Sequence, residues 1–319
     1  MVQQGQIQLA IVIPAYKGKY LGKTLDALAC QTCMDFNVYI GNDGSPDDID
    51  EIVAPHLSKL NFAYKKFENN VGLKSLVAHW RRCIDLTGNE PWIWLLPDDD
   101  VPDSKCVEHF YNLIATEQGL NLYRFITNHI DEQGKEIKKN MIPPEIEIGI
   151  DFIINKLMFI RNSSVAEYIF SKKAFIEAGG FTEIPLAWGA DDILWFKLSF
   201  PKGIYTIRTS MVSLRQSKDN ISNNTESTKY LKIKGTYCSL IHLTSTNLFK
   251  KELRKCDTKN RLNEILQFYL FNNFRSYRIK LNLTRALTYA RLNQKLWGKS
   301  YLRNLYWLIL YVKKSRTDA

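Results

Sequence analysis

The chain has 319 residues, of which 45% are hydrophobic and 24% charged, so it can bury one large core or two smaller ones. Residues 226–319 carry 20 Lys and Arg against 5 Asp and Glu, whereas residues 1–225 carry 23 against 28. This composition is typical of a globular rather than a disordered protein. The basic C-terminal part predicts an anionic partner, such as lipid headgroups, nucleic acid or a phosphorylated substrate.

The N-terminal sequence and the cysteine spacing favour an intracellular protein. No apolar run reaches the ~20 residues of a membrane-spanning helix, and the polar N-terminus lacks a signal-peptide pattern. Cys30 and Cys33 form a pair, but no second pair follows at zinc-binding spacing. We therefore expect a cytoplasmic protein with reduced thiols.

Residues 9–126 alternate predicted strands and helices. Strands are expected at residues 9–13, 36–40, 62–67, 92–96 and 120–126, with the third as a weaker edge strand. Apolar residues at helical spacing lie between them, and Ser45 or Asp47 is the expected cap of the second helix. This order predicts parallel βαβ units and an α/β fold.

After about residue 128 the pattern becomes irregular. A short helix is expected from Ser171 to Ala178, with Ser171 as its cap and Gly179-Gly180 as its stop. A helix at 193–200 and two strands at 203–207 and 211–214 are expected to follow. A polar loop is expected at 217–227, and the chain beyond it is helical, basic and aromatic. We therefore predict a first unit at 1–225 and a helical C-terminal region at 226–319.

Three consecutive carboxylates, Asp98, Asp99 and Asp100, follow the apolar strand that begins at Trp92. Like charges repel, so this arrangement is favourable when a divalent cation binds between them, and hard oxygen ligands suit Mg²⁺ or Mn²⁺. The alternative is a solvated acidic turn in which Asp103 caps the next helix.

Two other predicted strands also end in polar or special residues. Ligands of open α/β sheets bind at the carboxyl ends of strands, and Pro14-Ala15-Tyr16 and Asp43 follow the first and second strands. Tyr16 can stack on a nucleotide base and Asp43 can accept from a base N–H. The alternatives are a packing role for Tyr16 and an Asx-turn at Asp43. Neither a Gly-x-Gly-x-x-Gly nor a Walker A sequence is present.

Several motifs in order resemble family 2 glycosyltransferases, whose fold is called GT-A. They are Ile11 to Tyr16, Gln31-Thr32, Asn42 to Ser45, Asn70-Val71-Gly72, Asp98 to Asp100, Gly179 to Glu183, and Asp191-Asp192. Lys17 and Asn42 depart from that family's usual Asn and Asp. The resemblance covers about residues 7–225 and implies a GT-A fold, a mostly parallel sheet with flanking helices, and a bacterial polysaccharide-type enzyme.

The resemblance implies an inverting transfer from a nucleotide diphosphate sugar, with uridine as the expected base, to a hydroxyl of a glycan or lipid-linked acceptor. It assigns the general base to Asp192 and an orienting role to Asp191. Mn²⁺ or Mg²⁺ would be held by Asp98 and Asp100, with Asp99 near the ribose or sugar. Arg215 resembles a basic residue over the pyrophosphate, and Trp188 and Phe181 suggest an aromatic acceptor platform.

Two other functions compete with this interpretation. A sugar nucleotidyltransferase also needs a metal, but it would show a Gly-rich loop where this chain has Pro14 to Lys17. A nucleic-acid-binding protein would explain the basic, aromatic C-terminal region. No motif at groove-reading spacing occurs there, so no nucleic acid partner is expected.

The end of the chain suggests a membrane surface as a further partner. Leu302, Leu305, Leu308, Ile309 and Val312 lie close to one helical stripe, with aromatic and basic residues beside it. Such a stripe suits the headgroup region of an anionic membrane, which predicts peripheral attachment through 226–319 at the inner face of the plasma membrane. The alternative is that it packs on the catalytic unit.

Overall fold

The computed structural model describes residues 8–116, 119–218, 220–221, 225–256, 260–297, 303–304, 306 and 308. Within these residues a ten-stranded sheet has the order β3-β2-β1-β4-β9-β6-β10-β5, with β7 on β6 and β8 on β10. The strands are β1 Leu9–Ala15, β2 Phe36–Asn42, β3 Phe62–Lys66, β4 Trp92–Leu95, β5 Val101–Pro102, β6 Leu122–Ile130, β7 Glu136–Lys139, β8 Ile146–Glu147, β9 Tyr168–Ser171 and β10 Ile204–Arg215.

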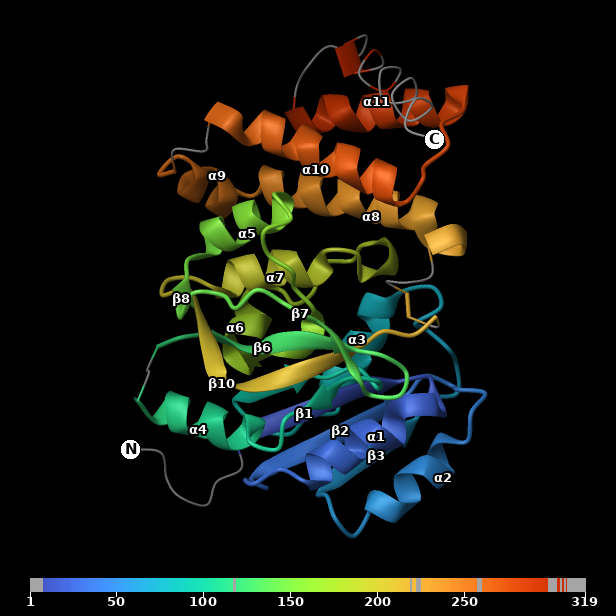
Figure 1. Cartoon of the computed structure of the whole chain (residues 1–319), viewed down its shortest axis with the longest axis vertical. Coiled ribbons are helices and arrows are strands. Elements are labelled where there is room, and N and C mark those ends of the chain that lie inside the picture. Colours follow the sequence, from blue (N-terminus) through green and yellow to red (C-terminus); the bar gives the residue numbers. More distant parts are fainter. Residues whose placement is uncertain are drawn as a thin grey trace.

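Helices cover the sheet and extend beyond it at one end. They are α1 Gly18–Ala29, α2 Ile49–Val53, α3 Leu76–Ile84, α4 Cys106–Thr116, α5 Gly149–Leu157, α6 Lys172–Glu177, α7 Ala190–Leu198, α8 Thr225–Ser245, α9 Asn247–Leu253, α10 Leu262–Ser276 and α11 Leu283–Trp297, with short 3₁₀ helices η1 Ala54–His56, η2 Val165–Glu167 and η3 Pro185–Ala187. In Figure 1 the strands lie at one end of the molecule, α5 and α7 in the middle, and α8 to α11 at the other end.

The parallel half of the sheet forms as predicted. Strands β3, β2, β1 and β4 are mutually parallel, and β3 lies at the edge. Alternate residues of β1 belong to two separate hydrophobic cores, one on each face of the sheet. Leu9 and Ile11 belong to the core that contains residues of α1 and α4, and Ala10 and Val12 belong to the core that contains residues of α3. A strand buried on both faces reads as a continuous apolar run, which explains the first predicted strand.

Local details of this half differ from the predictions. Asp48, rather than Ser45 or Asp47, caps α2, because its side chain accepts from the Glu51 N–H. Helix α3 begins at Leu76, and Leu73, three residues earlier, lies outside the helix and is 85% exposed.

The second half of the sheet is mixed. Strand β9 is antiparallel to both β4 and β6, while β10 runs parallel to β6. The two strands expected at 203–207 and 211–214 are one strand, β10, whose register on β6 shifts between Ile207 and Met211. Such a bulge lets polar residues interrupt the apolar pattern without ending the strand. The short helix predicted after Ser171 is α6, and Ser171 caps it.

The C-terminal helices pack on the rest of the chain. Helix α8 begins at Thr225, inside the loop expected at 217–227, and Ile233, Tyr237 and Leu240 bury their side chains. These residues belong to the same core cluster as Val12 of β1. The division at residue 225 stays a prediction.

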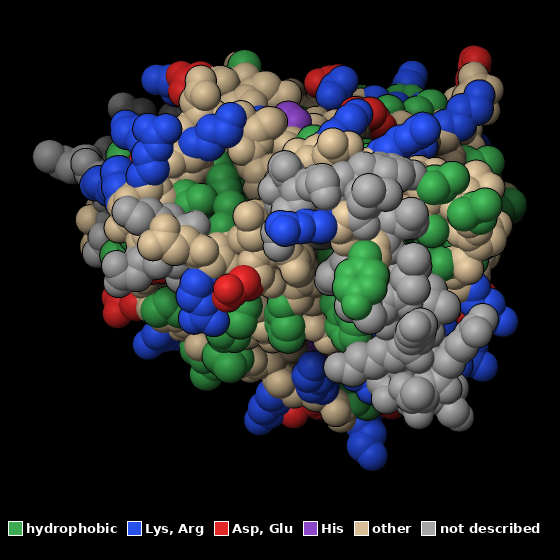
Figure 2. All heavy atoms as spheres, turned by 90° about the horizontal axis from the view of Figure 1, so that it is seen from above, with side chains coloured by type: hydrophobic (Ala, Val, Ile, Leu, Met, Phe, Trp, Pro, Cys, Tyr) green, Lys and Arg blue, Asp and Glu red, His purple; other side chains and the backbone are tan. Residues whose placement is uncertain are grey.

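Part of the C-terminal stripe lies outside the described residues. Leu302, Leu305, Ile309 and Val312 are not among them, and Leu308, which is, has no exposed surface. No helix of the described part of the chain is both long and apolar enough to span a bilayer. In Figure 2 the face formed by the C-terminal helices shows Lys and Arg side chains around exposed apolar ones.

Candidate active site

One cavity of about 900 Å³ joins the carboxyl ends of the parallel strands to the C-terminal helices. We call the part lined by Tyr16, Asp43 and Asp98 to Asp100 the strand end, and the part lined by Lys156, Trp188, Tyr269 and Tyr277 the helix end. Of the site residues predicted from the sequence, Ala15 and Phe181 do not line this cavity. The others do: Pro14, Tyr16, Asp43, Asp98, Asp99, Asp100, Trp188, Asp191, Asp192 and Arg215.

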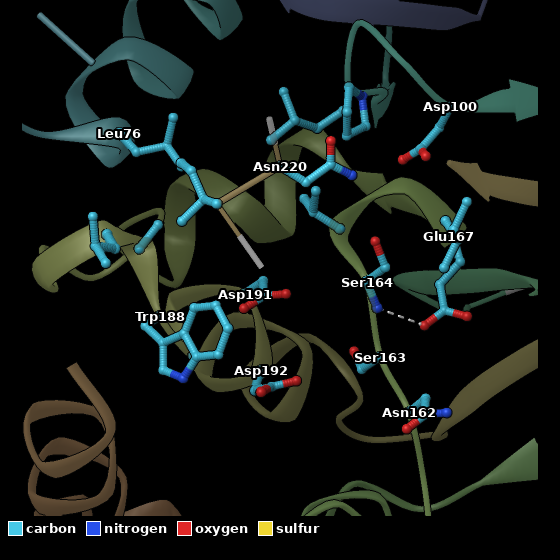
Figure 3. Close-up of a pocket in the computed structure, with 18 of the residues that line it drawn as sticks. Leu76, Asp100, Asn162, Ser163, Ser164, Glu167, Trp188, Asp191, Asp192 and Asn220 are labelled. Carbon is cyan, nitrogen blue, oxygen red and sulfur yellow. Dashed lines mark hydrogen bonds between the residues drawn. The ribbon is translucent and has the colours of Figure 1, made fainter. Parts of the chain in front are cut away.

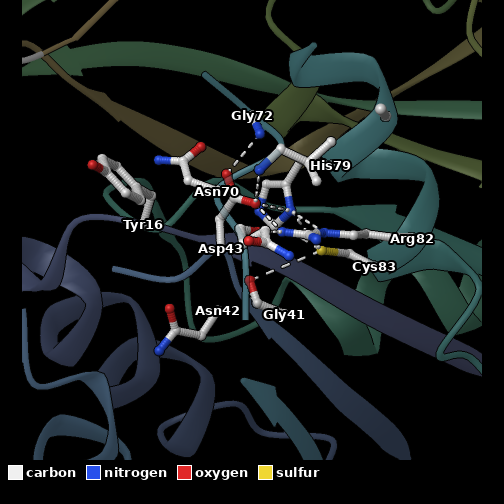
Figure 4. Close-up of polar contacts among 12 residues, drawn as sticks. Tyr16, Gly41, Asn42, Asp43, Asn70, Gly72, His79, Arg82 and Cys83 are labelled. Atoms are coloured by element: carbon white, nitrogen blue, oxygen red, sulfur yellow. Dashed lines mark hydrogen bonds and ion pairs between the residues drawn. The ribbon is translucent and has the colours of Figure 1, made fainter. Parts of the chain in front are cut away.

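Asp43 is buried and its carboxylate is held by backbone and side-chain donors. Oδ1 accepts from the Val71 N–H at 3.0 Å and Oδ2 from the Gly72 N–H at 2.8 Å. Arg82 Nη2 also donates to Oδ1. Figure 4 shows these groups converging on Asp43. The Asn70-Val71-Gly72 motif therefore has a structural role, which is to fix the orientation of Asp43. The side chain that closes the turn after β2 is that of Asn42, whose Oδ1 accepts from the Ser45 N–H three residues on.

His79 packs beside this carboxylate, with its Nδ1 at 3.4 Å from Asp43 Oδ1. Burial lowers the pKa of His79 to about 4, and although Asp43 raises it, Arg82 lowers it further. The imidazole is therefore neutral near pH 7, and Arg82 is the cation that pairs with Asp43.

The aspartate triplet is bound to two neighbouring strand ends. Asp98 Oδ2 accepts from the backbone N–H groups of Tyr16 and Lys17 at 2.9 and 3.0 Å. Asp100 Oδ1 accepts from the Arg215 N–H at 2.9 Å. The hydrogen bonds of Asp98 and Asp100 therefore bring the ends of β1, β4 and β10 together.

Burial makes ionisation of all three carboxylates unfavourable. It raises the pKa of Asp98, against the opposing effect of the two backbone N–H groups. Burial and then the neighbouring Asp98 raise the pKa of Asp99 to about 7. Burial and then Asp99 raise the pKa of Asp100 well above its usual range. A divalent cation would relieve both effects, so the donor set fits Mg²⁺ or Mn²⁺.

Protein side chains alone do not complete a metal site. Among the described residues, no three or more His, Cys, Asp or Glu side chains are grouped closely enough to hold an ion. Asp103 does not favour the alternative of a capped acidic turn, because its carboxylate accepts from the Met211 N–H on β10. The remaining ligands of a cation would come from a bound phosphate or water.

Arg215 is buried at the end of β10, where its side chain hydrogen-bonds to neighbouring loops of the strand end. Its Nε donates to the Asp99 carbonyl at 3.1 Å, and its Nη1 donates to the carbonyls of Asp131 and Glu132. The guanidinium also lies 4.7 Å from the centre of the Tyr20 ring. These contacts fix the turn after β6 against the aspartate triplet, and the guanidinium adds a positive charge to this part of the cavity.

Asp191 and Asp192 lie in the first turn of α7, between the two ends of the cavity. Lys156 of α5 donates to Asp192 Oδ1 at 3.0 Å, and both side chains are mostly buried. Burial opposes the charge of Lys156, but Asp192 and then Asp191 raise its pKa. Burial and then Asp192 raise the pKa of Asp191 to about 7, whereas Lys156 lowers it.

The two aromatic residues expected on an acceptor platform have different positions. Trp188 lines the helix end of the cavity, and its ring meets that of Tyr277 edge-on, with centres 6.2 Å apart. Phe181 is only 3% exposed and packs in the core against Trp80 and Trp195. Phe181 is therefore a packing residue and does not contribute to the platform.

Lys156, Tyr269 and Tyr277 were not expected at the site. Helix α5 was not predicted, because no capping side chain marks its start: its N-cap residue is Ile148. Tyr269 and Tyr277 lie in a region that the family resemblance does not cover. No motif connects these residues with the aspartates that they approach.

Residues 10–171, half of the chain, match the family model described as glycosyl transferase family 2. The chain therefore belongs to this family and is a glycosyltransferase. It is 28% identical over 215 residues to the chondroitin synthase of Escherichia coli, a match that covers 58% of this chain. The chain spans only 31% to 40% of the length of the first curated relatives that it matches.

Solved structures share the GT-A fold. The structure of S. aureus TarS 1–349 in complex with UDP-GlcNAc has a TM-score of 0.65 and 15% sequence identity, and the alignment covers 91% of this chain and 81% of that one. The mannosyltransferase PcManGT from Pyrobaculum calidifontis, in complex with GDP-Man and Mn²⁺, has a TM-score of 0.55 at 13% identity, covering 99% and 88%. The predicted GT-A fold with a helical C-terminal region is confirmed.

Proposed function

We propose that this glycosyltransferase moves a sugar from a nucleotide diphosphate sugar, with UDP as the carrier, to a hydroxyl of a glycan or lipid-linked acceptor, with inversion at the anomeric carbon. The observation that carries this proposal is the single cavity that joins Asp43 and Asp98 to Asp100 with Asp191 and Asp192. A nucleotide at the strand end would present its sugar to the two aspartates of α7.

Asp192 is the proposed general base. The acceptor oxygen attacks the anomeric carbon, its proton passes to the Asp192 carboxylate, and the bond from that carbon to the diphosphate breaks with its electron pair on the departing oxygen. Lys156 holds the Asp192 carboxylate in one orientation by an ion pair of 3.0 Å. Asp191 would orient the acceptor through a hydrogen bond.

Tyr16, Asp43 and the aspartate triplet are proposed to bind the nucleotide. Tyr16 is 39% exposed and can stack on the base. The backbone N–H groups of Val71 and Gly72 fix the orientation of the Asp43 carboxylate, which can accept from a base N–H. Pro14 and Ala15 shape the end of β1, where the Ala15 carbonyl accepts from the Asp43 N–H. Asp99 would contact the ribose or sugar, and Arg215 the pyrophosphate.

Mn²⁺ or Mg²⁺ is the proposed cofactor, held by Asp98 and Asp100. When bound, it would neutralise charge on the leaving diphosphate. Support comes from the raised pKa values of the triplet and from PcManGT, whose complex contains Mn²⁺.

A thermal-shift screen tests the donor site. UDP, GDP, dTDP and their sugar conjugates are added with and without Mn²⁺, and a ligand that binds the folded state raises the melting temperature. We expect one nucleotide to act, and Asp100→Asn to remove the Mn²⁺-dependent part of the shift. Release of pyrophosphate instead of a nucleoside diphosphate during turnover would favour the sugar nucleotidyltransferase alternative.

Peripheral membrane attachment through 226–319 stays a proposal. It rests on the positive charge of this region, to which each Lys or Arg near an anionic surface adds about 1 kcal/mol. Co-sedimentation of the full chain with anionic and with neutral vesicles tests it. Equal, negligible binding to both vesicle types would contradict it.

A further inference from the structure

Lys17 occupies the N-cap position of α1, where a lysine does not stabilise a helix. Its side chain makes no capping hydrogen bond, and the first turn of α1 contains no acidic residue. A lysine ammonium can only donate, whereas the N–H groups at a helix start need acceptors, and its charge repels the positive end of the helix dipole. Helix formation therefore does not account for a lysine at this position.

Carboxylates of other segments cap this helix instead. The Lys17 N–H donates to Asp98 Oδ2 at 3.0 Å, and the Gly18 N–H donates to Asp47 Oδ2 at 2.7 Å. These hydrogen bonds fix the backbone of Lys17 beside the aspartate triplet, while its side chain has no part in capping the helix.

The Lys17 side chain is half-buried and lines the strand end of the cavity. Burial raises the pKa values of Asp98 and Asp99, and the positive charge of Lys17 lowers both. Such an effect falls off with distance, so the ammonium group lies close to these two carboxylates. Lys17 therefore adds a cation beside the proposed metal site.

This part of the cavity faces the donor rather than the acceptor. Figure 3 shows Asp100 of the triplet apart from Asp191 and Asp192, where the acceptor hydroxyl is proposed to react. A cation beside the triplet is therefore placed to meet the diphosphate of the donor.

The charges at the strand end leave a role for such a cation. Three carboxylates and a diphosphate carry more negative charge than one divalent ion neutralises. Arg82 is paired with Asp43, and the Arg215 guanidinium already donates to backbone carbonyls, that of Asp99 among them. Lys17 has a compact charge on a flexible stem, which suits contact with a phosphate oxygen.

We propose that the ammonium group of Lys17 binds the diphosphate of the nucleotide sugar, beside the divalent cation assigned to Asp98 and Asp100. This inference rests on the proposed function and adds a donor-binding residue at a position where the chain departs from the family's usual Asn. A second source of positive charge means that removal of the metal weakens diphosphate binding without abolishing it.

The alternative is that Lys17 only neutralises the triplet when no metal is bound. A counter-ion of this kind opposes metal binding, whereas a phosphate ligand acts together with the metal. Removal of the charge would strengthen Mn²⁺ binding in the first case and weaken diphosphate binding in the second.

Isothermal titration calorimetry on the full chain separates these two roles without turnover. Uridine, UMP and UDP, or the matching series for the base that the thermal screen selects, are titrated in EDTA and in Mn²⁺, and Mn²⁺ is also titrated alone. Lys17→Met removes the charge, Lys17→Arg keeps it, and Lys17→Asn is a second uncharged variant with a favoured N-cap residue type. Lys23→Met is the control, because Lys23 is an exposed lysine of α1 that does not line the cavity.

We expect the Kd of UDP to rise about tenfold in Lys17→Met and in Lys17→Asn, with and without Mn²⁺, which is about 1.4 kcal/mol. The Kd of uridine should stay constant, and Lys17→Arg and Lys23→Met should match the wild type. Thermal melting in EDTA checks that each variant is folded.

Three outcomes would overturn the inference. They are an equal rise in Kd for uridine and UDP, complete loss of UDP binding by the wild type in EDTA, and tighter Mn²⁺ binding in Lys17→Met with an unchanged Kd of UDP. A wild type that binds none of the three ligands, with or without Mn²⁺, would overturn the proposed function as well.

Discussion

The two ends of the cavity are built in different ways. At the strand end, backbone N–H groups hold the carboxylates: Tyr16 and Lys17 donate to Asp98, and Val71 and Gly72 donate to Asp43. At the helix end, side chains hold other side chains, as Lys156 holds Asp192 and Asn162 holds Asn140. Backbone donors are set by strand register, whereas side-chain pairs depend on how separate helices and loops pack.

This difference suggests how the two substrates are recognised. A backbone N–H is present at almost every residue, so the strand end can keep its geometry while the surrounding side chains change. The helix end depends on the identity of each side chain, so single substitutions there can change the acceptor. Changes at the strand end should therefore affect the donor, and changes at the helix end the acceptor. Four predictions test this separation.

The largest effect is expected where the two ends meet. Asp192→Asn keeps the shape of the side chain and removes its basicity, so kcat should fall by ~10²–10⁴-fold with nearly unchanged donor affinity. Steady-state kinetics and nucleotide titration measure both quantities. Asp191→Asn is the matched control and should have a smaller effect. A larger fall in kcat in Asp191→Asn than in Asp192→Asn would assign the role of general base to Asp191 instead.

At the strand end, Gly72→Ala should weaken the donor alone. A Cβ at this position would lie 2.5 Å from Asp43 Oδ2, so the carboxylate must move away from its backbone donors. We expect the donor KM to rise about tenfold, which corresponds to about one charge-assisted hydrogen bond, and the acceptor KM to stay constant. Gly22→Ala in α1 is the control, since its Cβ meets Ile52 at an ordinary 3.8 Å. A rise in both KM values would show that the two ends are coupled.

At the helix end, Gly235→Ala should weaken the acceptor alone. Helix α8 approaches the loop before α7 so closely that a Cβ would lie 2.8 Å from both the Pro185 carbonyl oxygen and Trp188 Cβ. Alanine favours the helix by about 0.5–1 kcal/mol, but the methyl group must displace the Pro185 carbonyl group and the Trp188 side chain. The acceptor KM should rise about fivefold, which corresponds to about 1 kcal/mol of binding free energy. An unchanged acceptor KM together with a raised donor KM would contradict the assignment of this end.

Removal of the Lys156 charge should change the pH dependence of turnover. Lys156 favours the ionised form of Asp191, whose pKa is about 7, so Lys156→Gln should raise that pKa and leave Asp192 without its ion pair. More of the Asp191 carboxyl is then protonated at neutral pH, and the acid limb of the kcat profile should move to higher pH by about one unit. Lys172→Gln, whose ammonium hydrogen-bonds Thr87 and Gly88 elsewhere, is the control. A shift to lower pH would contradict the charge argument.

The strand end was largely predictable from the sequence. Tyr16, Asp43 and Asp98 to Asp100 directly follow apolar runs of strand length, and such runs place their ends at one edge of a parallel sheet. The capping of α2 was less predictable, because Ser45, Asp47 and Asp48 are all capping residue types and only the backbone conformation selects Asp48.

The helix end was not predictable to the same degree. Phe181 and Trp188 are both aromatic residues beside motif residues, and only tertiary packing shows that the first is buried in the core and the second lines the cavity. Likewise, the polar residues Arg208 and Ser210 divide β10 in the sequence, whereas in the structure the register shift accommodates them. Long-range packing decides these positions, and it leaves no local periodicity.

The core shared by β1 and α8 has a consequence for how this protein can be divided. Val12, Tyr237 and Phe274 belong to one apolar cluster, so a chain that ends at residue 225 would expose side chains that are fully buried in the intact protein. Such a fragment is expected to aggregate rather than to fold as an independent module. Acceptor preference could then not be exchanged between relatives by grafting the C-terminal helices alone. The sheet and the C-terminal helices would have to be exchanged together.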